Sequence, residues 1–535
     1  MSNFETSISL CLIVRNEAAR LPRCIESARP AVDEIVVVDT GSTDGTQQVA
    51  ARLGARVSEF PWVDDFSAAR NASLERSRMA WALVLDADET LQEGGAERIR
   101  QAVRDDEASG YFLHFVSPLE GGETSRFLIV RLFRRAPGVF FENVIHEQVT
   151  TSLNAWWKPR GKKLKLLDLL VHHDGYREEI FQSRGKEARN LALFEKQLRL
   201  HPHDPYSWYK YGDFLRHARH KDKALAALKR AFDLLVTLPI DEIQALPFSG
   251  EIVTLLALEL HERGADEEAF GLLQETSAIQ PCTANRTYVY GGLALRTGRL
   301  EAARQAFERC LTLRDEPEFV ARRDGVTGHL ALTGLAAVAA RMGRLEEGCE
   351  LYSRALRMNP RHGPAATALA TVLMLAGRTA EAVRVLEEYL REVPRDPHAW
   401  LRGASALLRL GQPERAFHWT ERAREAGASP VGLARLRGAV HLAMGRPCAA
   451  VQAFECFPAD EECRAGLWLA RVLEGLPRLD ALEEEDRAES AGVKALIEVL
   501  GAAGRWSEVE KLAARCRSLG GVLKTAGGRP ARGGP

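Results

Sequence analysis

Features of exported, membrane-embedded or disulfide-stabilised proteins are scarce in this sequence. Its nine cysteines are scattered and none belongs to a Cys-X-X-Cys pair, which is typical of reduced thiols in a cytoplasm. No stretch approaches the about 20 apolar residues that a membrane-spanning helix needs. The first residues include acidic Glu5 and lack the basic and apolar segments of an export signal. We therefore expect a soluble cytoplasmic protein, at most peripheral to the inner membrane face.

Net charge is almost absent as well. Lysine and arginine together number 72 and aspartate and glutamate 73, so the formal net charge is −1. This balance gives no whole-molecule attraction to nucleic acid, which we do not expect as a partner. The sequence also contains no P-loop Gly-Lys-Ser/Thr, no Gly-X-Gly-X-X-Gly and no His-Glu-X-X-His. Their absence argues against a nucleotide hydrolase, a dinucleotide enzyme and a zinc protease.

Alternating strand and helix patterns fill the first third of the chain. With 535 residues the chain is too long for one compact core, so we expect two to four domains or one domain plus a repeat array. Strand patterns at 8–14, 34–38 and 55–60 alternate with helix patterns at 18–28 and 47–53. This order predicts parallel strands joined by right-handed crossovers.

Carboxylates follow two of the predicted strands. The apolar run that begins at Trp81 ends in Asp86, Asp88 and Glu89, and Asp39 ends the second strand. Asp86 and Asp88 lie two residues apart, so on an extended backbone they share a face and can converge on one hard cation. A site built from oxygen atoms suits Mg²⁺ or Mn²⁺, whereas zinc prefers sets of histidine and cysteine.

Four motifs in order carry a family resemblance. Segments 9–17, 33–46, 64–71 and 81–89 together resemble a family-2 inverting glycosyltransferase of the GT-A fold, including its Asp-X-Asp motif. The resemblance covers the first third of the chain. It implies an α/β GT-A nucleotide-diphospho-sugar transferase domain, which we expect to span residues 1–178.

The resemblance also assigns roles to residues in these motifs. It implies that the nucleoside pocket is formed by Arg15, Asn16, Glu17 and Asp39. Arg70 and Asn71 would close over the nucleotide or sugar. Asp88, with Asp86, would bind the metal. Asp86 would also meet the ribose. A divalent metal, Mn²⁺ or Mg²⁺, neutralises the charge that grows on a departing diphosphate.

Later segments supply candidates for a base and for a further metal ligand. An inverting transfer needs a base that takes the acceptor's proton. The resemblance implies that Glu147 is this base, with His146 beside it. The alternative is that Glu147 is an ordinary exposed residue of a strand. Many GT-A enzymes use a late histidine as a metal ligand, which implies His172, and a structural histidine is the alternative.

The remainder of the chain is helical and self-similar. One long helix is predicted within 179–203, followed by an all-α array over 204–519 and a low-complexity tail at 520–535. A small residue recurs at intervals of 45, 34, 45, 34, 34 and 34, and the members are Ala224, Ala269, Ala303, Gly348, Ala382, Ala416 and Ala450. The interval of 34 matches a tetratricopeptide repeat, so we predict a superhelix of seven such repeats with a concave groove for protein partners.

These patterns together predict a metal-dependent inverting glycosyltransferase. The donor would be a nucleotide-diphosphate sugar, such as a UDP-sugar, and the repeats would recruit the acceptor. The pairing of the two parts resembles a recurrent bacterial group, some members of which glycosylate peptides or proteins. Two alternatives stay open, namely a transferase of surface polysaccharide or lipopolysaccharide assembly, and a non-catalytic repeat scaffold whose first domain senses nucleotide sugar.

Overall fold

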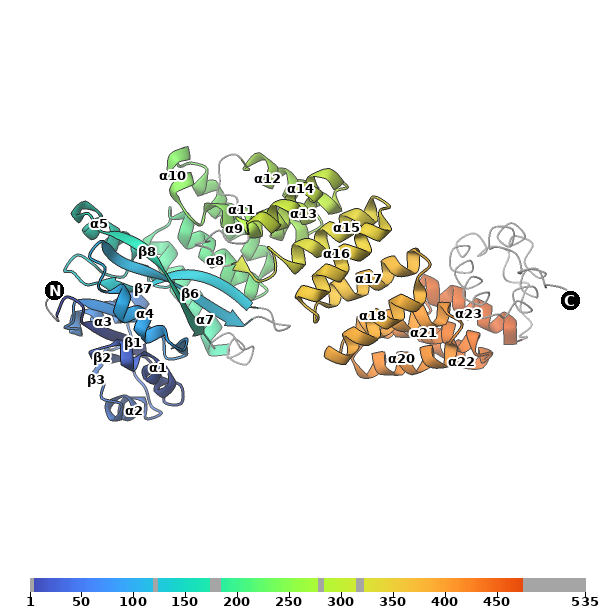
Figure 1. Cartoon of the computed structure of the whole chain (residues 1–535), viewed down its shortest axis with the longest axis horizontal. Helices are drawn as coiled ribbons and strands as arrows, with labels where there is room; N and C mark the ends of the chain where they lie inside the picture. Colours follow the sequence, from blue (N-terminus) through green and yellow to red (C-terminus); the bar gives the residue numbers. More distant parts are fainter. Residues whose placement is uncertain (1–3, 119–123, 174–183, 278–282, 314–321, 475–535) are drawn as a thin grey trace. The chain divides into compact units, whose positions relative to one another are not determined.

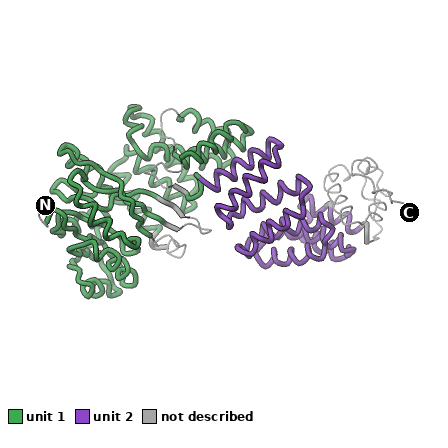
Figure 2. The backbone as a smooth tube through the Cα atoms, in the orientation of Figure 1, with its two compact units in different colours: residues 1–327 green, residues 328–535 purple. Residues whose placement is uncertain are grey.

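The computed structural model describes residues 4–118, 124–173, 184–277, 283–313 and 322–474 (Figure 1). The backbone forms two compact units, residues 1–327 and 328–535 (Figure 2). The predicted tail at 520–535 and the last part of the predicted array lie outside the described residues. No helix in the described part of the chain is both long and apolar enough to cross a membrane.

A mixed sheet organises the first part of unit 1. Its strands lie in the order β3-β2-β1-β4-β7-β6-β8-β5, and β9 pairs with β7. The strands are β1 (Ile8–Val14), β2 (Glu34–Asp39), β3 (Arg56–Glu59), β4 (Trp81–Val84), β5 (Glu89–Leu91), β6 (Ala108–Pro118), β7 (Thr124–Arg134), β8 (Lys163–His173) and β9 (Arg322–Arg323). The helices of this part are α1 (Leu21–Ala28), α2 (Thr46–Arg52), α3 (Phe66–Arg76), α4 (Gly95–Ala102) and α5 (Thr150–Trp157). The predicted α/β fold is confirmed.

The central strands are parallel and end at one edge. Strand β1 lies between β2 and β4, with Val14 opposite Asp39 and Cys11 opposite Val84. Because their carboxyl ends face the same way, the residues that follow β1, β2 and β4 gather at one sheet edge. On its other side β4 pairs antiparallel with β7, which brings a distant segment of the chain to the same region.

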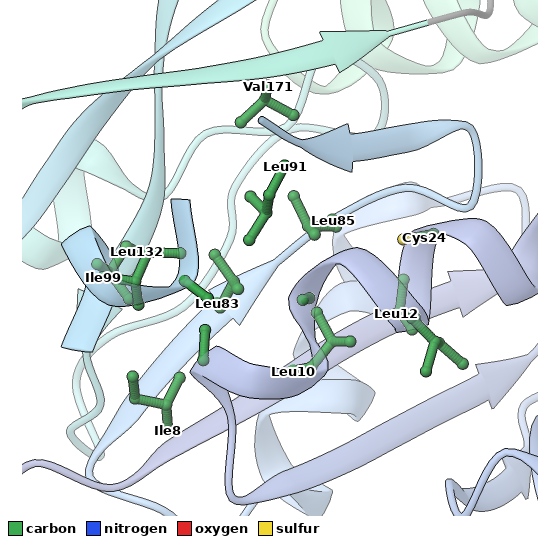
Figure 3. Packing of buried hydrophobic residues seen from close by; sticks show 14 of the residues in the cluster. Ile8, Leu10, Leu12, Cys24, Leu83, Leu85, Leu91, Ile99, Leu132 and Val171 are labelled. Atoms are coloured by element: carbon green, nitrogen blue, oxygen red, sulfur yellow. The ribbon is translucent and has the colours of Figure 1, made fainter. Parts of the chain in front are cut away.

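Both faces of the central strands are buried. Ile8, Leu10 and Leu12 of β1 pack on one face together with Leu83 and Leu85 (Figure 3). The opposite face of the same strands buries Cys11, Ala82 and Val84 against Phe133 and Phe141. Burial on both faces explains why these strands appear in the sequence as nearly unbroken apolar runs.

Paired helices follow the sheet. Unit 1 continues with α7 (Arg184–Leu200), α8 (Pro205–His217), α9 (Lys221–Leu235), α10 (Ile240–Ala245), α11 (Ser249–Glu262), α12 (Asp266–Glu275), α13 (Ala284–Arg296) and α14 (Leu300–Thr312). Unit 2 contains α15 (His329–Arg341), α16 (Leu345–Met358), α17 (Gly363–Leu375), α18 (Thr379–Glu392), α19 (Pro397–Arg409), α20 (Pro413–Glu425), α21 (Pro430–Ala443), α22 (Pro447–Glu455) and α23 (Glu461–Glu474). The first interval of 45 residues in the predicted repeat contains the additional helix α10.

The recurring small residues lie where paired helices cross. Ala224, Ala269 and Ala303 are fully buried on the second helix of their pairs. A Cβ atom added to Gly212 of α8 would lie 2.7 Å from Cγ of Leu228 on α9, so glycine allows this close approach. The predicted boundary at residue 178 lies inside unit 1, which extends from the sheet through α14.

Two adjacent glycines of α13 provide a test of this packing. A Cβ at Gly291 would lie 2.9 Å from Cε1 of Phe307, whereas one at Gly292 would meet nothing within 4 Å. Both changes to alanine gain about 1 kcal/mol of helix propensity, and overpacking costs about 1–3 kcal/mol at Gly291 alone. We expect Gly292→Ala to raise the thermal unfolding midpoint measured by circular dichroism. Gly291→Ala should either leave this midpoint unchanged or lower it. Equal midpoints would contradict the close approach of α13 and α14.

Candidate donor and catalytic site

The loop after β2 is built around the carboxylate of Asp39. This side chain is buried and accepts hydrogen bonds from the backbone N–H groups of Gly41 and Ser42, at 3.3 and 3.0 Å, and from the Ser42 hydroxyl. The amide of Gln47 donates a further bond of 2.8 Å. Burial opposes ionisation, but these donors lower the pKa of Asp39, so it is a carboxylate at neutral pH.

The loops after β1 and β2 are joined by reciprocal hydrogen bonds. Asn16 has a left-handed backbone with φ of 56°. Its Oδ1 accepts the N–H of Thr43 at 2.8 Å, and its own N–H donates to the Ser42 hydroxyl at 2.9 Å. The N–H of Glu17 donates to Thr46 Oγ1 at 2.9 Å, and Arg15 is exposed beside this junction. The structure therefore brings Arg15, Asn16 and Glu17 next to the Asp39 loop.

Arg70 of α3 connects two carboxylates from distant parts of the chain. Its Nη2 lies 2.9 Å from Oδ1 of Asp86, and its Nε donates to Oε1 of Glu147 at 2.5 Å. The side chain of Arg70 is only 3% exposed. Despite burial, Asp86 and Glu147 raise the pKa of Arg70, which stays charged. Arg70, Asp86 and Glu147 thus form one ionic cluster at the end of β4.

Asn71, the neighbour of Arg70, fixes the segment that leads to Glu147. Its Nδ2 donates to the carbonyl of Phe141 at 2.9 Å, and its Oδ1 accepts the N–H of Phe141 at 2.7 Å. Both ends of the amide are thus used by one backbone residue. Asn71 is predicted to close over the nucleotide or sugar. In the structure its side chain holds a loop of the protein itself.

Sequence reasoning misses Arg131 and the role of Glu89 in this cluster. Arg131 of β7 is buried, and its Nη2 lies 3.4 Å from Oδ2 of Asp86 and 3.6 Å from Oε1 of Glu89. Glu89 is also buried and accepts the backbone N–H of Asp86 at 2.8 Å. Although burial favours the neutral acid, Arg70 and Arg131 lower the pKa of Asp86 to about 2. Burial and the nearby Asp86 raise the pKa of Glu89 to about 7.

Asp88 faces a histidine, but not the predicted one. Nε2 of His173 lies 3.6 Å from Oδ2 of Asp88, and these side chains are 20% and 22% exposed. His172 is exposed, and neighbouring strand residues point to opposite sides of a sheet. Since β8 pairs with β5 so that Glu89 lies opposite His173, the register brings His173 rather than His172 to Asp88. The structure therefore places His173, and not the predicted His172, beside Asp88.

The residues around Asp88 fit part of a divalent metal site. Among the described residues no group of three or more histidine, cysteine, aspartate or glutamate side chains could hold a metal ion. Asp88 and His173 form a partly exposed pair of an oxygen and a nitrogen ligand, and Mg²⁺ commonly takes its remaining ligands from water and substrate phosphates. Asp86 is predicted to bind the metal together with Asp88, but in the structure both of its carboxylate oxygens accept hydrogen bonds from Arg70. This pair fits a cation shared with a diphosphate.

His146 and Glu147 are adjacent in sequence but lie in different environments. The ring of His146 is 5.5 Å from that of Phe194 on α7, and the residue keeps an exposed face. The side chain of Glu147 is 13% exposed and joins Arg70. The structure brings Glu147 into the ionic cluster with Arg70 and places His146 against the helices that follow the sheet.

Comparisons with known proteins agree with this architecture. Residues 9–153 match the glycosyl transferase family 2 model, and residues 288–317 and 339–403 match tetratricopeptide repeat models. The chain therefore carries a family 2 glycosyltransferase domain followed by tetratricopeptide repeats. A tetratricopeptide repeat protein from Parabacteroides merdae has a similar solved structure, with a TM-score of 0.37 and 16% identity over 56% of this chain and 98% of that one.

Curated relatives match part of the chain. A TPR repeat-containing protein of Synechococcus elongatus is 37% identical over 210 residues, which are 39% of this chain and 52% of that protein. The SPbeta prophage-derived glycosyltransferase SunS of Bacillus subtilis is 26% identical over 247 residues, or 42% and 53% of the two chains. An uncharacterized glycosyltransferase of Rickettsia felis is 42% identical over 84 residues, or 16% and 29%. The chain spans about half the length of the first two.

Substitution of Arg70 tests the ionic cluster without reference to any reaction. Arg70→Met removes the shared partner of Asp86 and Glu147. Breaking a buried ion pair on one side costs about 3–5 kcal/mol, and since Asp86 is one-third exposed we expect the lower end, measured by urea unfolding. Arg98→Met is the control, because its pair with Asp168 is 48% and 89% exposed and should change stability by less than about 1 kcal/mol. Similar losses in both variants would contradict the central position of Arg70.

Proposed function

Since the chain carries a family 2 glycosyltransferase domain followed by tetratricopeptide repeats, we propose that it transfers a sugar from a nucleoside diphosphate donor, such as a UDP-sugar, with inversion. One observation carries the proposal. The pair formed by Asp88 and His173 and the cluster formed by Arg70, Asp86 and Glu147 both lie at the carboxyl end of β4, which pairs in parallel with β1. This edge of an open α/β sheet is where ligands commonly bind.

The loops after β1 and β2 are suited to the nucleoside. Asp39 is ionised and fixed by four hydrogen bonds, so it holds the loop after β2 in the shape that would receive a base or a ribose hydroxyl. Nη1 of Arg70 and Nε of Arg131 have no hydrogen-bond partner among the residues that the structure describes. Such cationic donors suit the oxygen atoms of a donor sugar or diphosphate.

Asp88 and His173 would hold Mn²⁺ or Mg²⁺. When bound, such a cation neutralises the negative charge that collects on the diphosphate as the glycosidic bond breaks. The other negative charges nearby are balanced within the protein, because Arg70 pairs with Asp86 and Glu147 and Arg131 lies beside Asp86 and Glu89. The carboxylate of Asp88 therefore stays available for this task.

Glu147 is the proposed base. The acceptor's nucleophilic atom forms a bond to the anomeric carbon, and its proton passes to a carboxylate oxygen of Glu147. The bond from that carbon to the diphosphate breaks at the same time, and its electron pair leaves with the nucleoside diphosphate. Because Arg70 binds Oε1 of Glu147, the orientation of the carboxylate is set before substrates arrive.

The repeats would deliver the acceptor, and a peptide or protein is the proposed class. Nε2 of Gln148, next to Glu147, donates to the hydroxyl of Tyr206 on α8 at 2.9 Å. The first repeat helix therefore contacts the segment that carries the proposed base. Tetratricopeptide grooves bind extended peptides, so an acceptor held along the array can reach this segment.

Donor hydrolysis tests the proposal without knowledge of the acceptor. With a panel of UDP- and GDP-sugars and Mn²⁺, we expect slow release of nucleoside diphosphate, measured by chromatography. Asp88→Ala should lower this rate at least tenfold, because the charge on the diphosphate is no longer balanced. Equal rates in wild type and Asp88→Ala would remove the proposal.

Adjacent histidines serve as matched variants for the metal site. His173→Ala should raise the Mn²⁺ concentration that gives half-maximal hydrolysis by about 10–100-fold, while His172→Ala should leave it unchanged. The reverse order would restore the original assignment to His172.

A neutral analogue of Glu147 tests the base. Glu147→Gln keeps the volume and the contact with Arg70 but cannot take a proton. We expect it to lower donor turnover by about 10²–10⁴-fold, with unchanged Kd for the nucleoside diphosphate in calorimetry. Glu142→Gln is the control in the same loop and should retain wild-type turnover. A similar rate in both variants would assign the base to another group.

A further inference from the structure

The loop that carries Glu147 contains two residues in the left-handed backbone conformation. Its ends are joined by two backbone hydrogen bonds between Glu142 and Gln148, of 2.8 and 2.9 Å. Within it Asn143 and His146 have left-handed φ angles of 77° and 55°. Asparagine and histidine adopt such angles more readily than most residues, but the conformation still costs energy that contacts around the loop must offset.

Helix α7 follows the sheet in the chain (Figure 1) and contributes hydrogen bonds to this loop. Gln197 is 2% exposed. Its Oε1 accepts the backbone N–H of Val144 at 2.7 Å, and its Nε2 donates to Oδ1 of Asn143 at 2.8 Å. One amide side chain thereby holds the left-handed residue and the residue after it.

The same turn of α7 holds a further left-handed position in the loop before α3, the helix that carries Arg70. Nζ of Lys196 donates to the carbonyl groups of Val63 and Asp64 at 3.0 and 2.8 Å, and Asp64 has a φ of 53°. Phe194 of α7 is buried in one apolar cluster with Val144 of the Glu147 loop. Adjacent residues of α7 therefore hold the loop before α3 and the loop that carries Glu147.

We infer that Gln197 is a positioning residue for Glu147, and that α7 is part of the transferase site rather than a connector to the repeats. This inference rests on the proposed function. Without Gln197 the buried N–H of Val144 loses its acceptor, and the side-chain oxygen of Asn143 loses its donor. The carboxylate of Glu147 then departs from the geometry that proton transfer requires, although the donor-binding residues are untouched.

The test compares two variants that lose the same helix–helix hydrogen bond. Nε2 of Gln197 also donates to Oγ of Ser207 on α8 at 3.0 Å, and the Ser207 hydroxyl donates its own proton to Asp204. Gln197→Ala should lower kcat for donor turnover at least tenfold, with KM for the donor within twofold of wild type. Ser207→Ala should leave both values within twofold. Gln197→Glu, which retains an acceptor for Val144 and the side-chain volume, should give an intermediate kcat.

Two further measurements separate positioning from general stability. In a Glu147→Gln background, Gln197→Ala should cause no additional loss of turnover, because the group that it positions no longer acts. Hydrogen–deuterium exchange of peptides covering residues 141–149 should be faster in Gln197→Ala than in Ser207→Ala.

The outcomes are distinguishable. An active wild type whose kcat is unchanged by Gln197→Ala overturns the inference and leaves the proposed function standing. Equal losses in Gln197→Ala and Ser207→Ala also overturn it, since they indicate a role in stability alone. A wild type without turnover on any donor rejects the proposed function, and equal exchange rates in the loop would then reject the role of Gln197 as well.

Discussion

The buried guanidinium of Arg70 is the interaction on which the site depends. It joins α3, the end of β4 and the loop that carries Glu147, because its nitrogen atoms contact Asp86 and Glu147 on separate sides. A buried cation without partners would be strongly unfavourable, and so would the two carboxylates without Arg70. The three segments therefore have to come together as a set. An arginine suits this position better than a lysine, because its planar group donates in several fixed directions.

Much of the fold could be predicted from local pattern, but less of the charge network. The periodicity of β1, β2 and β4 and the recurring alanines identify parallel strands and paired helices because each pattern reflects burial of one element. Arg131 is different, since its partners lie more than forty residues earlier in the chain. The available signal is a single charge within the apolar run of β7, around 127–133. A charge in such a run indicates a buried partner, although it does not identify that partner.

The sequence points to His172, whereas His173 lies beside Asp88, and this difference also arises from contacts between distant segments. A shift of one residue in a strand moves every side chain to the other face, so the choice depends on register. Register between β5 and β8 is fixed by pairing of Glu89 with His173 across a long stretch of sequence. No local property of two consecutive histidines contains that information. The same limit applies to Gln197, which appears in sequence as an unremarkable polar residue of a helix.

The boundary between the two compact units does not coincide with the residue at which helical periodicity begins. The helical pattern begins near residue 180, but unit 1 continues to Thr327. Gln197 holds one end of the Glu147 loop and Tyr206 contacts the other through Gln148, while Gln197 and Ser207 connect the two helices to each other. A movement between α7 and α8 would therefore change both ends of a loop of only a few residues. In this arrangement the helices that begin the repeat array cannot be independent of the sheet, because the same contacts that start the array complete the loop.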